Sequence, residues 1–542
     1  MEINLTPKLS YKAAAFFMLL GTLWMYFTKV LADPDFWFHM TVGREVILSG
    51  QIPDKSFYIS GLLGAPEKFY EWGFGTLLYL THSIFGETGL SALNTALASF
   101  TVLILVVQAW VSADNKWVII GAIIAGLAVA IGLDGRVALR PENVLFVAIA
   151  ATIACLEIRN RTGNNKWLYP VPVIGFVMSN LHPSAIILVA TVCCYLVQDA
   201  FKGRSWEASK ALLLTAIATS VAAMVTPLGP MQLFLPFFFA ADAALTGQVV
   251  EFFPILTTPL APIFIVIFIF GVVAFIPKPR SPNAIANGIL FFIFTILTLR
   301  YSRNIGLFAI AAFNPLCHLV TTVLSRAESN ISKKTAVGMA CLSMAALIAL
   351  LVWHRYTMHN IGFGFRKGVF PSYAIKVRDQ KDISAIASLF HFGGYLAWVT
   401  HKPVLVDGRN YSFNSVMQDH NDIFSRQPQW DRLLKKNHID SIFTPALQPF
   451  RGTPVPLLGE LYFSQNWKLC AFDEVGLWFY RSDKVAGYGM NKDLIWKRMN
   501  EDLHRKNSFL RPADPVLRLS REKEKVAANI PWPQESEFCL PR

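Results

Sequence analysis

Acidic and basic residues that could move a proton or bind a phosphate occur in a few short motifs of this chain. In DPDFWFHM (33–40), an α-helix would place Asp35 and His39 on one face, with space beside Gly43. A carboxylate so placed could act as a general base for a hydroxyl group. Alternatively, Asp33 caps the helix, Asp35 is a first-turn acid favoured by the helix dipole, and His39 makes a structural hydrogen bond.

Arginines at two further motifs could bind a phosphate. In LTLRYSRNIGLF (297–308), Arg300 and Arg303 are predicted to lie one helical turn apart at a helix end. Guanidinium groups bind phosphate oxygens in bidentate fashion, although arginines at a membrane interface also simply extend towards water. In DGRVALRPENV (134–144), Arg140 and Glu142 flank Pro141. Pro141 is predicted to begin a helix, whose N-terminus alone would favour an acid at Glu142.

The elements that carry these motifs are predicted to be membrane-spanning helices. The chain has 542 residues, of which 54% are hydrophobic and 16% charged. A bilayer core needs about 20 consecutive apolar residues for each helix. Such runs predict a mainly α membrane bundle of about eleven spans, at residues 13–31, 88–111, 117–133, 143–156, 167–181, 183–199, 211–226, 260–277, 284–299, 305–324 and 335–353.

Lysines and arginines concentrate in alternate loops between these runs, which indicates a cytoplasmic N-terminus and an outer, periplasmic region after Trp353. The net charge of +13 therefore reflects membrane topology, and nucleic acid is not expected as a partner. The first outer loop (32–87) is long, and its segment 74–87 is interpreted as an interfacial helix, because a span there would invert every later loop. A second amphipathic interfacial helix is expected from Asp33, its N-cap, to Gly50.

This topology gathers ionisable residues at the outer face. Such groups at membrane depth indicate a functional site by default, although ordinary helix-end anchoring is the alternative. The outer set is Asp33, Asp35, His39, Arg44, Glu71, Asp134, Arg136, Arg140, Glu142, His182, Glu251, Arg300, Arg303 and Asn304.

The region after the spans is predicted to be a small α/β domain (354–482) followed by a charged tail (483–542), so that the membrane domain is 1–353. Asp407, Gly408 and Arg409 follow a predicted buried strand, and a turn with a paired aspartate and arginine is favoured there over a ligand site. Cys470 and Cys539 are the cysteines of this region, and no zinc spacing occurs. Strands are expected at 403–407, 440–444, 468–472 and 476–480, and helices at 380–390, 411–424, 429–437 and 491–504.

The order of these motifs resembles the C-type glycosyltransferases (GT-C), and more closely a group of largely uncharacterised bacterial members. Phe38 and Met40 depart from the more usual Trp and Leu, which changes packing but leaves the polar positions intact. The similar motifs are DPDFWFHM (33–40), GR (43–44), GQIP (50–53), EW (71–72), RPE (140–142), NLH (180–182), TPLG (226–229) and RN (303–304), with a weaker match at GGYLAW (393–398) and VLVDGRNY (404–411).

The resemblance implies an inverting transfer of a sugar from a polyprenyl-phosphate carrier to a glycan, lipid or protein acceptor at the outer face of the plasma membrane. Asp35 or Asp33 would be catalytic, while substrate-binding residues would be His39, Glu71, Arg140, Glu142, His182, Arg300 and Arg303. No metal or other cofactor is assigned, although Asp33, Asp35, Glu71 and Glu142 could together hold a divalent cation. A lipid-linked-saccharide transporter and a non-catalytic assembly or scaffold protein are the alternatives.

Overall fold

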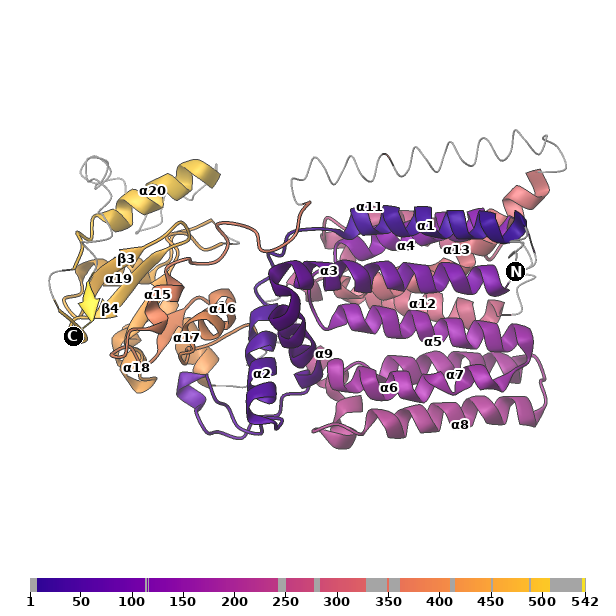
Figure 1. The fold of residues 1–542 in the computed structure, drawn as a ribbon, viewed down its shortest axis with the longest axis horizontal. Helices are drawn as coiled ribbons and strands as arrows, with labels where there is room; N and C mark the ends of the chain where they lie inside the picture. The colour runs from indigo at the N-terminus through magenta and orange to yellow at the C-terminus, as the bar shows by residue number, and fades with distance from the viewer. Residues whose placement is uncertain are drawn as a thin grey trace, which may run out of the picture. The chain divides into compact units, whose positions relative to one another are not determined.

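The computed structural model describes residues 7–112, 115, 117–241, 250–276, 283–327, 349, 361–409, 415–449, 452–486, 489–506 and 539–541. The chain divides into two compact units (Figure 1). The helical unit consists of Met1–Leu31 and Tyr70–Phe365, and the α/β unit consists of Ala32–Phe69 and Arg366–Arg542. Most of the first outer loop, residues 32–69, thus packs with the C-terminal residues rather than with the helices that flank it in sequence.

The helical unit is a bundle whose helices lie side by side (Figure 1). Ten of the eleven predicted apolar runs coincide with its described helices, and the run 335–353 lies outside the described residues except for Ala349. The α-helices are α1 (Pro7–Phe27), α3 (Trp72–Ser112), α4 (Val118–Asp134), α5 (Glu142–Thr162), α6 (Pro170–Leu181), α7 (Ile186–Phe201), α8 (Trp206–Ala223), α9 (Leu235–Ala241), α11 (Ala261–Val273), α12 (Ala284–Arg300) and α13 (Ile305–Ala327), and the 3-10 helices are η2 (Asn165–Leu168), η3 (Gly229–Leu233), η4 (Val250–Phe252), η5 (Ile255–Thr257) and η6 (Ser302–Asn304).

By length and composition, two helices of the described residues could cross a membrane, Trp72–Ser112 and Ser302–Ala327, and six further apolar helices are shorter. Apolar side chains also cover the outside of the bundle: on α11, Val266, Ile269 and Phe270 are each more than half exposed. A stack of phenylalanines, among them Phe264 and Phe308, fills the interior between α11 and α13. Exposed apolar side chains of this kind are expected where a helical bundle faces hydrocarbon.

A kink divides the longest helix, α3, at Gly86, whose φ of 62° and ψ of −157° are not helical. The segment 74–87 is therefore helical, as predicted, and is separated by this kink from the apolar run 88–111. Glycine is suited to this position because a side chain would be strained at that positive φ.

The α/β unit contains a four-stranded sheet in the order β1-β2-β4-β3, in which β1 and β2 are parallel and the other neighbours antiparallel. A separate two-stranded sheet joins β5 and β6. The elements are α2 (Phe36–Ser49), η1 (Ser60–Leu62), α15 (Ala374–Arg378), β1 (Ile386–Ser388), α16 (Phe390–Thr400), α17 (Ser415–Phe424), α18 (Trp430–Lys436), β2 (Ser441–Thr444), α19 (Leu457–Phe463), β3 (Trp467–Phe472), β4 (Leu477–Arg481), β5 (Val485–Ala486), α20 (Leu494–Lys506) and β6 (Leu540–Pro541).

Three of the four predicted strands are confirmed as β2, β3 and β4, whereas two assignments are wrong. The predicted helix at 380–390 contains the buried strand β1, because three small or β-branched residues pair there with β2. The predicted strand at 403–407 makes only isolated bridges, from Val404 to Ile59 and to Ile386.

A disulfide between Cys470 on β3 and Cys539 fastens the end of the chain to the sheet. The bond spans 69 residues of sequence, and β6 follows Cys539 directly. The two cysteines were recognisable in the sequence as the pair outside the apolar runs, but their pairing was not predicted.

Candidate active site

Asp35 lies at the N-terminus of α2, where it occupies the N-cap position. Its carboxylate makes no capping hydrogen bond to the helix. The backbone N–H of Asp35 instead donates to Oδ1 of Asp33, at 2.9 Å. The prediction that Asp33 is the N-cap is therefore wrong: the Asp33 side chain closes the turn before the helix, a local bond that short acidic side chains form readily.

The first half of α2 is enclosed by protein, since every residue from Phe36 to Gly43 is buried. In the second half of the helix, Ile47 and Leu48 are exposed, and the placement of this helix at a membrane interface stays a prediction. His39 is among the buried residues, and its ring lies 3.9 Å from the ring of Phe38, centroid to centroid. The structure thus places Asp33, Asp35 and His39 together on the α/β unit.

The helical unit contains a buried network of two arginines and two glutamates. The guanidinium of Arg136 binds Glu251 through two contacts, of 3.0 and 3.1 Å, and also pairs with Glu142. Arg140 pairs with the same Glu251. Arg136 and Arg140 lie between α4 and α5, Glu142 begins α5, and Glu251 lies on η4, so the network ties three segments together at one end of the bundle. We refer to Arg136, Arg140, Glu142 and Glu251 as the outer ionic network, after the predicted outer set to which all four belong.

The ion pairs of this network shift the pKa values of Glu251 and Arg136. Burial raises the pKa of Glu251, but the neighbouring Arg136 and Arg140, with Arg303, lower it well below its usual range. Burial lowers the pKa of Arg136, but Glu142 and Glu251 raise it above its usual value. Arg136 and Glu251 therefore stay charged across the physiological range, and Arg303 adds a further positive charge beside Glu251.

His182, at the C-cap of α6, is held neutral beside this positive charge. Burial, and then Arg303, lower its pKa to about 3. Its Nδ1 accepts a hydrogen bond from the N–H of Ser184, at 3.2 Å, so the proton is assigned to Nε2. His182 can consequently donate a hydrogen bond to an oxygen without carrying a charge.

Arg300 and Arg303 do not lie on one helical face, contrary to the prediction. Helix α12 ends at Arg300, and Tyr301 adopts extended angles of φ −137° and ψ 112°. Arg300 is exposed and lies over the ring of Tyr301, whereas Arg303 lies on η6 over the ring of Phe252, the neighbour of Glu251. Of the two, Arg303 is the one that acts electrostatically on Glu251 and His182.

Two of the predicted motifs, EW and NLH, meet at the adjoining ends of α3 and α6, and a third, TPLG, begins directly after the residue that they contact. The indole N–H of Trp72 donates to Oδ1 of Asn180 at 3.0 Å, and Nδ2 of Asn180 donates to the carbonyl of Val225 at 3.0 Å. Glu71 directly precedes Trp72 and is half-buried. The motifs EW and NLH, which are far apart in the sequence, are therefore hydrogen-bonded to each other, and NLH is also bonded to Val225, the residue before TPLG.

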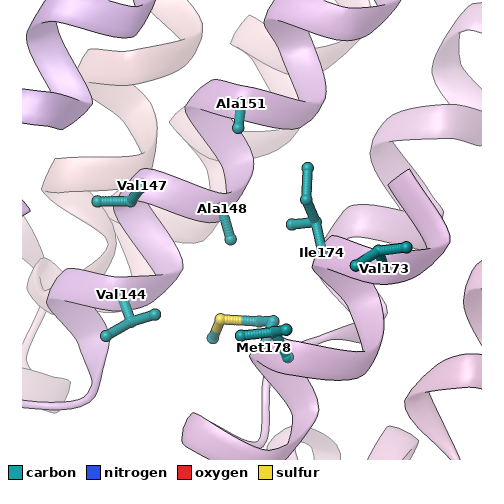
Figure 2. A pocket seen from close by; sticks show the side chains of 8 residues that line it. Val144, Val147, Ala148, Ala151, Val173, Ile174 and Met178 are labelled. Atoms are coloured by element: carbon teal, nitrogen blue, oxygen red, sulfur yellow. The ribbon is translucent and has the colours of Figure 1, made fainter. Parts of the chain in front are cut away.

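An apolar cavity of about 230 Å³ lies between α5 and α6 (Figure 2). It begins at Val144, two residues after Glu142, and at Met178, four residues before His182. Its lining is aliphatic and sulfur-containing: Val144, Val147, Ala148, Ala151, Val173, Ile174, Val177 and Met178. The cavity thus suits a hydrocarbon chain.

The turn after residue 406 contains the predicted pair of aspartate and arginine. The fully buried carboxylate of Asp407 accepts hydrogen bonds from the N–H of Arg409 (3.0 Å), from its Nε and from the hydroxyl of Tyr58 (2.5 Å). Burial, together with Asp407, raises the pKa of Tyr58 well above its usual value, so the hydroxyl remains a donor. Arg409 also pairs with Glu67, which links this turn to the end of the segment 32–69.

The structure distributes the predicted site residues over both units. Asp33, Asp35 and His39 belong to the α/β unit, and Glu71, Arg140, Glu142, His182, Arg300 and Arg303 to the helical unit. Arg136 and Glu251 belonged to the predicted outer set, but neither was among the residues predicted to bind substrate. Among the described residues, no three His, Cys, Asp or Glu side chains are grouped so as to hold a metal ion.

Fold and site together define a large helical bundle with buried arginine–carboxylate pairs at one end and an appended α/β unit. No protein-family model and no curated protein matches the sequence. Solved structures do match in fold. The archaeal oligosaccharyltransferase AglB from Archaeoglobus fulgidus, in complex with an inhibitory peptide and a dolichol-phosphate, aligns with a TM-score of 0.62 and 11% identity, over 98% of this chain and 82% of AglB.

Two bacterial structures match as well. ArnT from Cupriavidus metallidurans aligns with a TM-score of 0.53 and 12% identity, over 88% of this chain and 98% of ArnT. The arabinofuranosyltransferase AftD from Mycobacteria aligns with a TM-score of 0.54 and 12% identity, over 89% of this chain and 38% of AftD. These neighbours are GT-C glycosyltransferases, so the chain has the GT-C fold, which confirms the resemblance drawn from its motifs.

Proposed function

We propose that this protein is a membrane glycosyltransferase that moves a sugar from a polyprenyl-phosphate carrier to an acceptor hydroxyl at the outer face of the membrane. The observation that carries the proposal is the fold shared with AglB over nearly the whole chain, together with the dolichol-phosphate bound in that structure. GT-C glycosyltransferases are membrane proteins, which supports the multi-span arrangement expected from the eleven apolar runs.

Asp35 is the proposed general base. The acceptor oxygen attacks the anomeric carbon from the side opposite the phosphate, so the configuration inverts. As the new C–O bond forms, the acceptor proton passes to the Asp35 carboxylate, and the bond between the anomeric carbon and the phosphate oxygen breaks with its electron pair left on that oxygen. Polyprenyl phosphate is an adequate leaving group without a strong acid, so cationic stabilisation of the departing charge is the main further requirement.

The helical unit supplies the cationic groups that suit this leaving phosphate. Arg303 adds positive charge beside the outer ionic network, and the neutral His182 offers an Nε2–H donor. Arg140 and Glu142 lie within the network, while Glu71 and Arg300 are kept as further proposed contacts to substrate. The lining of the cavity between α5 and α6 is apolar and lies close in sequence to Glu142 and His182, so we assign the cavity to the isoprenyl chain of the carrier (Figure 2). Arginines of the network complement the charge of a phosphate.

The disulfide supports an outer location for the α/β unit. Structural disulfides persist in the periplasm and outside cells, and are rare in the cytosol. The test labels free thiols with a maleimide-linked polymer after cells are acid-quenched and the protein is denatured. A variant that keeps only Cys470 and Cys539 should carry no polymer when it is labelled without reductant. After reduction it should carry two. A matched variant that keeps only Cys539 should gain one adduct under both conditions. Two adducts without reductant would place the unit in the cytosol.

The lipid that copurifies with the protein tests the proposed donor. Native mass spectrometry of the full chain, purified in mild detergent, should detect a polyprenyl phosphate or its sugar conjugate bound at about one copy per chain. Replacing Val177 on the cavity wall by Trp should lower that occupancy, because the larger ring fills the space for the hydrocarbon chain. Retention of ordinary phospholipid alone, in both proteins, contradicts the proposal.

A further inference from the structure

Helix α2, which carries Asp35, is held along its length by α16 within the α/β unit. A Cβ atom at Gly394 of α16 would lie 2.9 Å from the backbone nitrogen of Phe38, so the two helices approach as closely as glycine allows. One helical turn beyond, Nη1 of Arg44 donates to the carbonyl of Trp398 at 2.9 Å, and the guanidinium lies 4.8 Å from the centroid of that indole. These contacts fix the axis of α2.

The Asp35 carboxylate itself lies against Gly408. A Cβ atom at Gly408 would be 2.7 Å from Oδ1 of Asp35 and 3.1 Å from the ring of Phe38. Gly408 is not among the glycines with positive φ, so its backbone conformation is open to other residues. The need for glycine at this position is therefore a need for space, and the atom that occupies that space is the proposed catalytic oxygen.

The loop that contains Gly408 is anchored on both sides. Before it, Asp407 is fully buried and accepts the hydroxyl of Tyr58. After it, Arg409 binds Asp407 and Glu67, and its guanidinium lies 4.6 Å from the centroid of the Tyr58 ring. Buried polar groups that are paired in this way resist displacement, because each would lose its partners. A side chain added at Gly408 would consequently move the Asp35 carboxylate rather than the loop.

We propose that the loop Asp407–Gly408–Arg409 positions the Asp35 carboxylate, with Gly408 as a positioning residue for the transfer reaction. This inference rests on the proposed function, and it gives the C-terminal part of the chain a role in turnover. A displacement of about 1 Å in a reacting group can cost about a hundredfold in rate. The proton acceptor is displaced while the substrate contacts of the helical unit are untouched, so kcat falls and the KM for donor does not.

The test is a double-mutant cycle in the full-length protein with Gly408→Ala and Asp35→Ala. The probe is a radiolabelled polyprenyl-phosphate hexose, and release of polyprenyl phosphate is measured together with the thermal midpoint. Gly408→Ala should lower kcat at least tenfold at an unchanged KM. In the Asp35→Ala background it should have no further effect on kcat, and its effect on the thermal midpoint should shrink, because the crowded oxygen is absent.

Gly476→Ala is the matched control in the same unit. A Cβ there would lie 2.7 Å from the carbonyl oxygen of Thr444, a similar crowding at a turn of the sheet. This variant should lose thermal stability but keep the kcat of its folded fraction. The positioning role is overturned if Gly408→Ala and Gly476→Ala lose kcat equally, or if Gly408→Ala keeps its full kcat. Either result leaves the proposed function standing. A wild-type protein that releases no polyprenyl phosphate overturns the proposed function and this inference with it.

Discussion

Replacing Asp35 by Asn should reduce turnover by about 10²- to 10⁴-fold, the range associated with loss of a general base. Asparagine has nearly the same shape as aspartate but does not accept a proton at neutral pH. Asp35 makes no capping hydrogen bond to α2, so the substitution does not remove a cap of this helix. Release of polyprenyl phosphate and the thermal midpoint, measured on the same purified protein, separate loss of chemistry from loss of fold.

Asp33→Asn is the matched control for this prediction. Oδ1 of an asparagine at this position can still accept the N–H of Asp35, which is the bond that Asp33 makes in the structure. We therefore expect less than about a tenfold loss of turnover, because the turn before α2 is retained. If Asp33→Asn is the more damaging substitution, the roles of the two aspartates must be exchanged, and if neither lowers turnover, the base is not on this motif.

Replacing Arg136 by Ala should destabilise the helical unit by roughly 3 to 5 kcal/mol, the usual cost of breaking a buried ion pair from one side. Glu142 would lose the arginine that it pairs with, and Glu251 would lose one of two. Both carboxylates are then left at the end of the bundle with less positive charge around them. The thermal midpoint should fall by several degrees, and the affinity for polyprenyl phosphate should fall with it.

Arg300→Ala is the control for the arginine network. Arg300 is exposed and contacts the neighbouring Tyr301, so its removal should leave the thermal midpoint nearly unchanged. Exposed charges of this kind contribute little to stability. A similar drop in stability for Arg300→Ala and Arg136→Ala would show that the outer ionic network has no special weight in this fold.

Helices of the bundle could be predicted from the sequence because a long apolar run is a local signal. The runs 88–111 and 305–324 became parts of α3 and α13 with only small shifts at their ends. Residues 380–390 were misassigned because the pairing of β1 with β2, more than fifty residues away, determines their conformation. Pairing over such distances leaves no pattern in a short window of sequence.

The sequence predicted which residues belong to the candidate site better than it predicted which of them contact one another. The outer set already contained Arg136 and Glu251, but their contact joins residues 115 positions apart and cannot be read from spacing. Arg300 and Arg303 were expected on one face because a continuous helix was assumed, and the extended backbone at Tyr301 breaks that helix. The disulfide between Cys470 and Cys539 escaped prediction for the same reason, since two cysteines alone do not indicate that they meet.

One measurement tests the central claim directly: incubating the purified full-length protein with a panel of radiolabelled polyprenyl-phosphate hexoses and pentoses, with water or membrane extract as the source of acceptor. The proposal predicts that at least one donor is cleaved to polyprenyl phosphate, with the label transferred to acceptor or released as free sugar, and that Asp35→Asn slows the cleavage by at least about a hundredfold. Intact donors throughout, or donors moved across vesicle membranes without cleavage, would contradict it and favour a scaffold or a transporter.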